Sequence, residues 1–409
     1  MATSTTSPTD RSLPRRLGRR LLPLHIGVAL QGFMLWAPVE KLFMSEIGFD
    51  ATAVGLAAAA YAAVVPVLEM PSGILADRWS RRGVLVVASS MLAACALVGG
   101  LSQDVLGYAF CAMFLGVYFA MYSGTLDAMV YDTVLDETGD SDGFERRIGV
   151  VRAIESAALV ASSLAGGWVA SLLSARTTYF LTIPLALLSI GAYLRFREPR
   201  LHRVEERTPL RKHVATTVRM LTRTRSLAPV IVLAVLSAVL MQSIFEFGPL
   251  WLVAIAAPAV LFGPYWAALM ATLGLGGLLA GRLDLDRPAV LAVVTGLLAL
   301  GSVTLTVATH VVVITLAQVL LGLLLMALAV HVGLLVHDAV PSTVRAGVAS
   351  GVSSLTWLAF LPFSVVFGVV STAFGVHAAG WLLTGVALLV GALVAGTALR
   401  RPALVTAAA

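Results

Sequence analysis

Charged residues are scarce in this chain. Asp, Glu, Lys and Arg make up 12% of its 409 residues, whereas hydrophobic residues make up 59%. Soluble domains carry about 25% charged residues, so a chain so poor in charge lacks the polar groups needed to cover a water-exposed surface. The composition excludes an ordinary soluble domain and indicates a membrane protein with many spans.

Cysteine is also scarce, and the motifs of common soluble enzymes are missing. Cys95 and Cys111 both lie inside apolar runs, which excludes a disulfide framework. There is no phosphate-binding loop, and the seven histidines are scattered rather than grouped at metal-ligand spacing. We therefore expect no enzymatic activity, no metal and no cofactor. We assign the net charge of +6 to loops at the membrane surface, not to a nucleic-acid-binding face.

Long apolar segments are what the chain has in abundance. Twelve of them, from 22–44 to 377–398, are each near the ~20 residues that a spanning helix needs. They predict an all-α membrane protein with twelve transmembrane helices in two groups of six. The predicted parts are an N-terminal tail (1–21), a six-helix bundle (22–195), a polar central loop (196–227), a second six-helix bundle (228–398) and a C-terminal tail (399–409).

The distribution of positive charge predicts the orientation. If the N-terminus is cytoplasmic, 25 of the 28 Lys and Arg residues fall on the cytoplasmic side. Lys41 and Arg176 fall outside, and Arg152 lies within a span. Because Lys and Arg collect in cytoplasmic loops, this bias places both termini in the cytoplasm of a multi-pass cell-membrane protein.

The turn between the second and third apolar segments carries a recognisable motif. Residues 73–82 read GILADRWSRR. The pattern G-x-L-x-D-R-x-x-R-R at this position resembles the signature loop of the major facilitator superfamily of secondary transporters. The one departure is Ser80, where the family usually has Gly. The resemblance implies two pseudo-symmetric six-helix bundles and transport by alternating access, and residues 69–73 (EMPSG) resemble a variant found in bacterial drug and metabolite exporters.

Each residue type in this loop suits a role at the membrane surface. Gly73 lets a neighbouring helix approach closely. Asp77 can face the positive N-terminus of another helix. The resemblance implies that the loop is a latch between the two halves. In the alternative, Arg78, Arg81 and Arg82 only anchor the topology.

Several acids lie towards the predicted cytoplasmic ends of the spans. Asp127 and Asp132 end the fourth span and could pair with Arg147 or Arg152, which favours a structural inner gate over proton transfer. Glu69 lies one turn before the loop, where it belongs either to the latch network or to a proton or substrate site.

The two halves of the chain resemble each other. Gln31 and Pro38 in the first span have the same separation as Gln242 and Pro249 in the seventh. Weaker echoes follow in the same order: GILADR (73–78) and GLLAGR (277–282), MVYDTV (129–134) and LVHDAV (335–340), RIGV (147–150) and RAGV (345–348). They predict halves related by an axis along the membrane normal, with a cavity at the midplane between them.

Ionisable residues within the spans are candidates for coupling. A charge at the bilayer centre costs at least ~2.5–3.5 kcal/mol, so each needs a partner or a task. Glu246 lies one turn beyond Gln242 with no Lys or Arg nearby in sequence, and we interpret it as a proton carrier or a contact for a cationic substrate. The alternative is a structural, protonated glutamic acid. Glu40, followed by Lys41, is either an interfacial pair in water or part of a gate, and His331 is either a structural group or a proton carrier.

The predicted cavity is mostly apolar with a few amides. Its candidate residues come from the first, fourth, seventh and eleventh spans: Gln31, Met34, Trp36, Tyr122, Gln242, Phe245 and Trp357. Such walls suit an amphipathic or aromatic solute better than a sugar. Alternatively, several of these side chains face lipid or pack between helices.

The function that we predict is proton-coupled export of small amphipathic or aromatic compounds by antiport. Drug antiporters of this superfamily often have a Gly-Pro in helix 5, and this chain keeps only Gly166 and Gly167 there. Two alternatives are therefore kept, a proton-coupled importer of a small nutrient and a transporter-like sensor that moves nothing. The expected partners are a small-molecule substrate, protons and the lipid bilayer, with the protein acting as a monomer.

Overall fold

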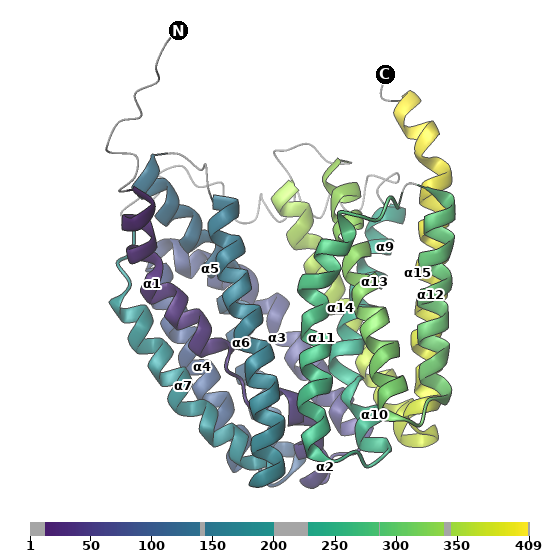
Figure 1. Ribbon diagram of the computed structural model, residues 1–409, viewed down its shortest axis with the longest axis horizontal. Helices are drawn as coiled ribbons and strands as arrows, with labels where there is room; N and C mark the ends of the chain where they lie inside the picture. Colours follow the sequence, from purple (N-terminus) through teal and green to yellow (C-terminus); the bar gives the residue numbers. More distant parts are fainter. Residues whose placement is uncertain (1–12, 140–143, 200–227, 286, 339–344, 408–409) are drawn as a thin grey trace.

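The computed structural model describes residues 13–139, 144–199, 228–285, 287–338 and 345–407, and Figure 1 shows that these ranges form a bundle of helices. Twelve helical stretches are long and apolar enough to cross a membrane, and the described residues contain no strand. The predicted all-α membrane fold is confirmed. Its elements are α1 (Leu13–Gly32), η1 (Ala37–Val39), α2 (Glu40–Glu46), α3 (Ala51–Arg78), α4 (Arg81–Leu101), α5 (Val105–Thr138), α6 (Phe144–Leu172), α7 (Ala175–Arg195), α9 (Ala228–Phe247), α10 (Pro249–Ala254), α11 (Ala259–Ala280), α12 (Pro288–Val307), α13 (Val311–Asp338), α14 (Arg345–Phe374) and α15 (Val376–Ala407).

Short polar turns determine where several helices begin. The side chains of Asp50, Ser80, Asp104 and Ser174 each accept a hydrogen bond from the backbone N–H three residues later. An N-cap of this kind satisfies a backbone donor that has no partner within the helix. The helices therefore start directly after the polar residue that ends the preceding turn.

Two spans are interrupted at corresponding places in the sequence repeat. The first span breaks between α1 and η1, where Pro38 lies in the first turn of η1, and the seventh breaks between α9 and α10, where Pro249 opens α10. Proline has no N–H and its ring crowds the preceding turn, which favours the start of a helical segment, although Pro66 and Pro184 lie inside continuous helices of this chain. The equal spacing seen in the sequence thus marks two equivalent breaks.

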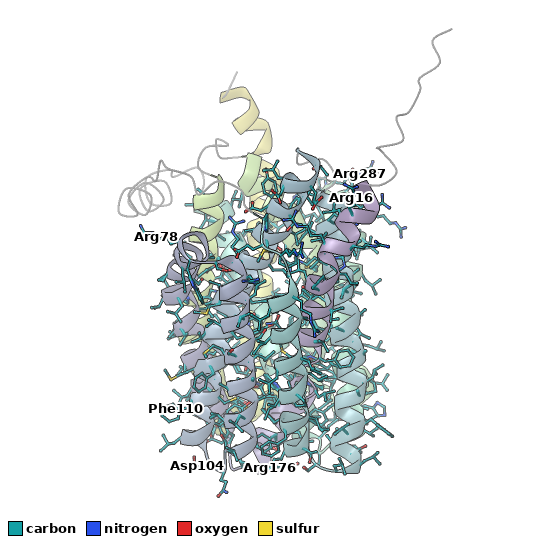
Figure 2. The ribbon with its side chains drawn as sticks, turned by 90° about the vertical axis from the view of Figure 1, so that its left-hand side faces the viewer. Arg16, Arg78, Asp104, Phe110, Arg176 and Arg287 are labelled. Carbon is teal, nitrogen blue, oxygen red and sulfur yellow. The ribbon has the colours of Figure 1, made fainter. Side chains whose placement is uncertain are left out.

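The helices form two groups that lie side by side in Figure 1. Helices α1–α7 (purple to teal) pack among themselves and are called the N-terminal group; α9–α15 (green to yellow) are the C-terminal group. The start of α1 and the end of α15 lie at the same end of the bundle, called here the terminal end. Figure 2 shows Arg16, Arg78 and Arg287 towards this end and Asp104 and Arg176 at the opposite, distal end.

The two groups are joined at the distal end by close packing of small residues. Helix α3 packs against α14, and α6 packs against α11. A Cβ added to Gly167 of α6 would lie 2.6 Å from the backbone nitrogen of Gly263 of α11. The hydroxyl oxygens of Thr52 and Thr372 are 2.9 Å apart across the α3–α14 contact. Because apolar surface alone does not drive helices together in lipid, such close backbone packing is a main source of association.

Candidate functional site

A buried group of charges connects the two helix groups near the distal end. The side chain of Lys41 on α2 is 3% exposed, and its Nζ lies 2.8 Å from Glu40 Oε2 and 2.5 Å from Glu246 Oε1. We call Glu40, Lys41 and Glu246 the distal charge cluster. Glu246 thus has a cationic partner 205 positions away in sequence. Lys41 is buried, which disagrees with the alternative of an interfacial pair in water.

The charges of the cluster do not cancel. One ammonium group faces two carboxylates, so the cluster carries one negative charge in excess when all three groups are ionised. Buried ions are stable only with good geometry and enough partners. Lys41 and Glu40 belong to the N-terminal group and Glu246 to the C-terminal group. The Lys41–Glu246 pair is therefore a bond between the two groups that must break if they separate at this end.

Glu40 has further partners within the N-terminal group. The Tyr108 hydroxyl lies 2.8 Å from Glu40 Oε1 and donates a hydrogen bond to it. Tyr108 and Tyr179 share a hydrogen bond between their hydroxyls at 2.7 Å, and both side chains are buried. Glu40 is thus held on its own group, where it can stay beside Lys41 independently of Glu246.

Aromatic and amide groups from three helices meet close to Glu246. The side chain of Tyr61 on α3 lies close to Gln242 of α9. The Tyr61 ring also packs edge-on against Trp357 of α14, with ring centroids 5.2 Å apart. Gln242, Glu246 and Trp357 were all predicted from the sequence, whereas Tyr61 was missed. As the only hydroxyl side chain between Thr52 and Ser72, it could have been found as an isolated polar group in an apolar span.

The other predicted cavity residues pack within single helix groups. Gln31 is 1% exposed, and its Oε1 accepts a hydrogen bond from the Tyr193 hydroxyl at 2.5 Å. Trp36 stacks on Tyr179, Tyr122 stacks on Tyr118, and Met34 is buried in the same core. Phe245 packs edge-on against Trp266 in the C-terminal group. The contribution of these side chains to a cavity stays a prediction.

The signature loop at the terminal end makes its described contacts within the N-terminal group. Arg81 forms an ion pair with Asp132 of α5, and Arg82 donates to the Phe196 carbonyl oxygen at 3.3 Å. Arg78 is exposed, and the side chain of Asp77 lies outside the described residues. Among the described residues, no atom lies within 4 Å of a Cβ added at Gly73, so they show no close helix approach of the kind expected there. The latch between the groups stays a prediction.

Other predicted residues occupy separate positions. Asp127 pairs with Arg152 at 2.6 Å, which confirms the expected contact, and Arg152 also contacts Glu155 at 2.9 Å. Glu69 is half-buried, and its Oε2 has no hydrogen-bond partner among the described residues. His331 is half-buried on α13. None of these residues belongs to the distal charge cluster.

The structure has two groups of transmembrane helices, which are joined at one end by close packing and by an ion pair. This arrangement is that of a transporter-like membrane protein. The family model of the Major Facilitator Superfamily matches residues 21–360, and the chain belongs to this family of transporters. The resemblance noted in the sequence is therefore confirmed. No curated relative matches the sequence.

Solved structures share this fold at low sequence identity. The nucleoside transporter NupG is similar with a TM-score of 0.73 and 12% identity, covering 91% of this chain and 98% of its own. A bacterial homolog of the human lysosomal transporter Spinster has a TM-score of 0.68 and 14% identity, covering 97% and 95%. A D-xylose–proton symporter has a TM-score of 0.65 and 13% identity, covering 91% and 97%. At such identities the likeness establishes the fold alone.

Proposed function

We propose that this transporter exports small amphipathic or aromatic compounds, preferentially cations, in exchange for protons. Proton and cargo compete for Glu246. The observation that carries the proposal is the buried Lys41–Glu246 ion pair between the two helix groups, with Oε1 and Nζ 2.5 Å apart. With both termini cytoplasmic, the distal end is the outer side, and the pair is an outer gate.

The charge balance of the cluster supports a coupling role. Opening the distal end moves Glu246 away from Lys41 and leaves a carboxylate without its partner. Breaking a buried pair in this way costs roughly 3–5 kcal/mol. A proton or an organic cation bound to Glu246 removes that cost, while Glu40, held by Tyr108, remains as the counter-ion of Lys41. The unloaded transporter therefore keeps the gate closed, and the loaded one opens it.

The neighbours of Glu246 favour an aromatic or amphipathic cargo. Tyr61, Gln242 and Trp357 offer two rings, a hydroxyl and an amide at the junction of α3, α9 and α14. An aromatic face attracts a cation, most strongly when water is excluded. A carboxylate beside two rings suits a flat or amphipathic cation.

The sign of the distal charge cluster also favours a cation. Lys41 contacts two carboxylates, so this cluster has one negative charge in excess. Negative potential in a low-dielectric region raises the local concentration of cations. The same field disfavours an anionic cargo.

Import of a small nutrient together with protons is the second candidate. Its support is the fold shared with a nucleoside transporter and a D-xylose–proton symporter. The same gate would serve a symporter if proton and cargo bound together rather than in competition. The two candidates thus differ in whether acid weakens or strengthens cargo binding.

Transport into inside-out vesicles separates the candidates. With an acidic lumen, radiolabelled tetraphenylphosphonium should accumulate by exchange, and acid should weaken its binding. Glu246→Gln keeps the shape but cannot titrate, so accumulation should fall to the level of vesicles without the protein. Asp284→Asn, an acid-to-amide change in an exposed pair with Arg287, should transport normally. Gradient-driven transport at the wild-type rate in Glu246→Gln would refute the proton-carrier role.

A further inference from the structure

The break in the seventh span lies two residues after Glu246 and is held by side chains from two other helices. The Gln318 amide on α13 donates a hydrogen bond from Nε2 to the Gly248 carbonyl oxygen at 3.3 Å. The Tyr265 hydroxyl on α11 donates to Gln318 Oε1. Both side chains are almost fully buried, Gln318 at 0% and Tyr265 at 2% exposure.

The Gly248 carbonyl oxygen at this break has two partners, the Gln318 amide and, at 3.2 Å, the Trp251 N–H of α10. Pro249 has no N–H, so it cannot continue the hydrogen-bond pattern of α9. The Gly248 N–H still bonds to the Ile244 carbonyl oxygen at 3.0 Å, which marks the end of the regular helix. A Cβ at position 248 would collide with Gln318 Oε1 and the Tyr265 hydroxyl, so glycine is required for their approach. Gln318 and Tyr265 therefore lie directly against the backbone of the break.

The same helix that carries Tyr265 also makes the contact between the two helix groups. Gly263, two residues earlier on α11, packs against Gly167 of α6. On the other side of the break, the Trp251 Nε1 donates to the Leu305 carbonyl oxygen at 2.7 Å and holds α10 on α12. Glu246 lies in the last turn of α9, two residues before the Gly248 carbonyl group that Gln318 contacts.

We propose that Gln318 is a positioning residue for the outer gate and that, with Tyr265, it links the α6–α11 contact to the orientation of Glu246. This rests on the proposed function, because it assumes that the Lys41–Glu246 pair is the gate. While α11 packs against α6, the Tyr265 hydroxyl holds the Gln318 amide by a hydrogen bond, and the amide holds the Gly248 carbonyl group. In this arrangement the Glu246 side chain points towards Lys41. When α11 moves away from α6, this support is lost and Glu246 is released from Lys41.

The test measures the state of Glu246 directly, without a transport substrate. Dicyclohexylcarbodiimide reacts with protonated carboxyl groups in apolar surroundings, so it should modify Glu246 slowly while that side chain is paired with Lys41. The modified fraction is measured by peptide mass spectrometry on the purified full-length protein. Tyr265→Phe removes one hydrogen bond and should raise the rate roughly fivefold. Gln318→Leu removes the bonds to both Gly248 and Tyr265 and should raise the rate at least as much. The double variant should do no more than Gln318→Leu alone, because the two residues act as one unit.

Two further variants make the outcome specific. Ser302→Ala removes a buried hydroxyl that bonds only within α12, and it should leave the rate unchanged. Lys41→Gln should raise the rate by removing the ion pair itself. If Lys41→Gln raises the rate but Tyr265→Phe and Gln318→Leu do not, the positioning role is refuted and the gate stands. If Lys41→Gln has no effect, the gate is refuted and the positioning role with it. Thermal unfolding midpoints confirm that each variant is folded.

Discussion

The contact between Gly167 and Gly263 offers the sharpest test of how the distal end closes. A Cβ on Gly167 would lie 2.6 Å from the Gly263 nitrogen, and ordinary contacts of a Cβ begin at 3.4 Å. The difference is 0.8 Å, so α6 and α11 must separate by about that much in Gly167→Ala. The opposing atoms belong to the backbone and cannot rotate away.

The expected magnitude follows from the cost of overpacking, which is typically about 1–3 kcal/mol. This cost falls on the state that is closed at the distal end and not on the open one. Gly167→Ala should therefore shift the equilibrium towards the open state by roughly 5- to 150-fold. Gly263→Ala should act in the same direction, because its Cβ would meet the Ser163 carbonyl oxygen at 2.7 Å.

Cross-linking across the α3–α14 contact measures this shift. Thr52 and Thr372, whose hydroxyl oxygens are 2.9 Å apart, are replaced by cysteines in a background without Cys95 and Cys111, and the rate of disulfide formation is followed. Gly167→Ala should slow it. A wild-type rate in Gly167→Ala would refute the reasoning.

Matched controls come from the same two helices. In the part of the chain that the structure describes, no atom lies within 4 Å of a Cβ added to Gly149 of α6 or Gly274 of α11. Gly149→Ala and Gly274→Ala should leave cross-linking unchanged apart from the small gain in helix propensity that alanine brings. An equal effect in these controls would show that the result comes from the helices themselves and not from the contact between them.

The remaining predictions concern the latch and the orientation. Asp77→Asn should slow transport and change the balance of the two open states while leaving substrate affinity nearly unchanged; normal turnover at normal expression would contradict the latch role. Single cysteines at positions 142, 205 and 284 should be labelled only from the cytoplasm, and a single cysteine at position 374 only from outside. The side chains of Asp284 and Phe374, which two of these cysteines replace, are exposed. Positions 142 and 205 lie outside the described residues, and labelling of 205 from outside would reverse the orientation and move the gate to the inner side.

Local patterns in the sequence were enough to predict the spans and the family. Each spanning helix needs about 20 apolar residues, a property that any window of the chain displays by itself. The equal spacing of Pro38 and Pro249 was visible in the sequence, but the breaks at these two prolines were shown only by the structure, because Pro66 and Pro184 lie inside continuous helices. The ion pair of Asp127 with Arg152 was also foreseeable, since a short turn brings the ends of neighbouring spans together.

The partner of Glu246 was decided only by the tertiary structure. Lys41 is 205 positions away, and nothing in either segment shows which faces of α2 and α9 meet. The same holds for Gln318, Gly167 and Gly263, whose roles depend on how helices from different parts of the chain are rotated against each other. In a membrane almost every helix face is apolar, so hydropathy, which locates the spans, carries little information about which side chains face each other.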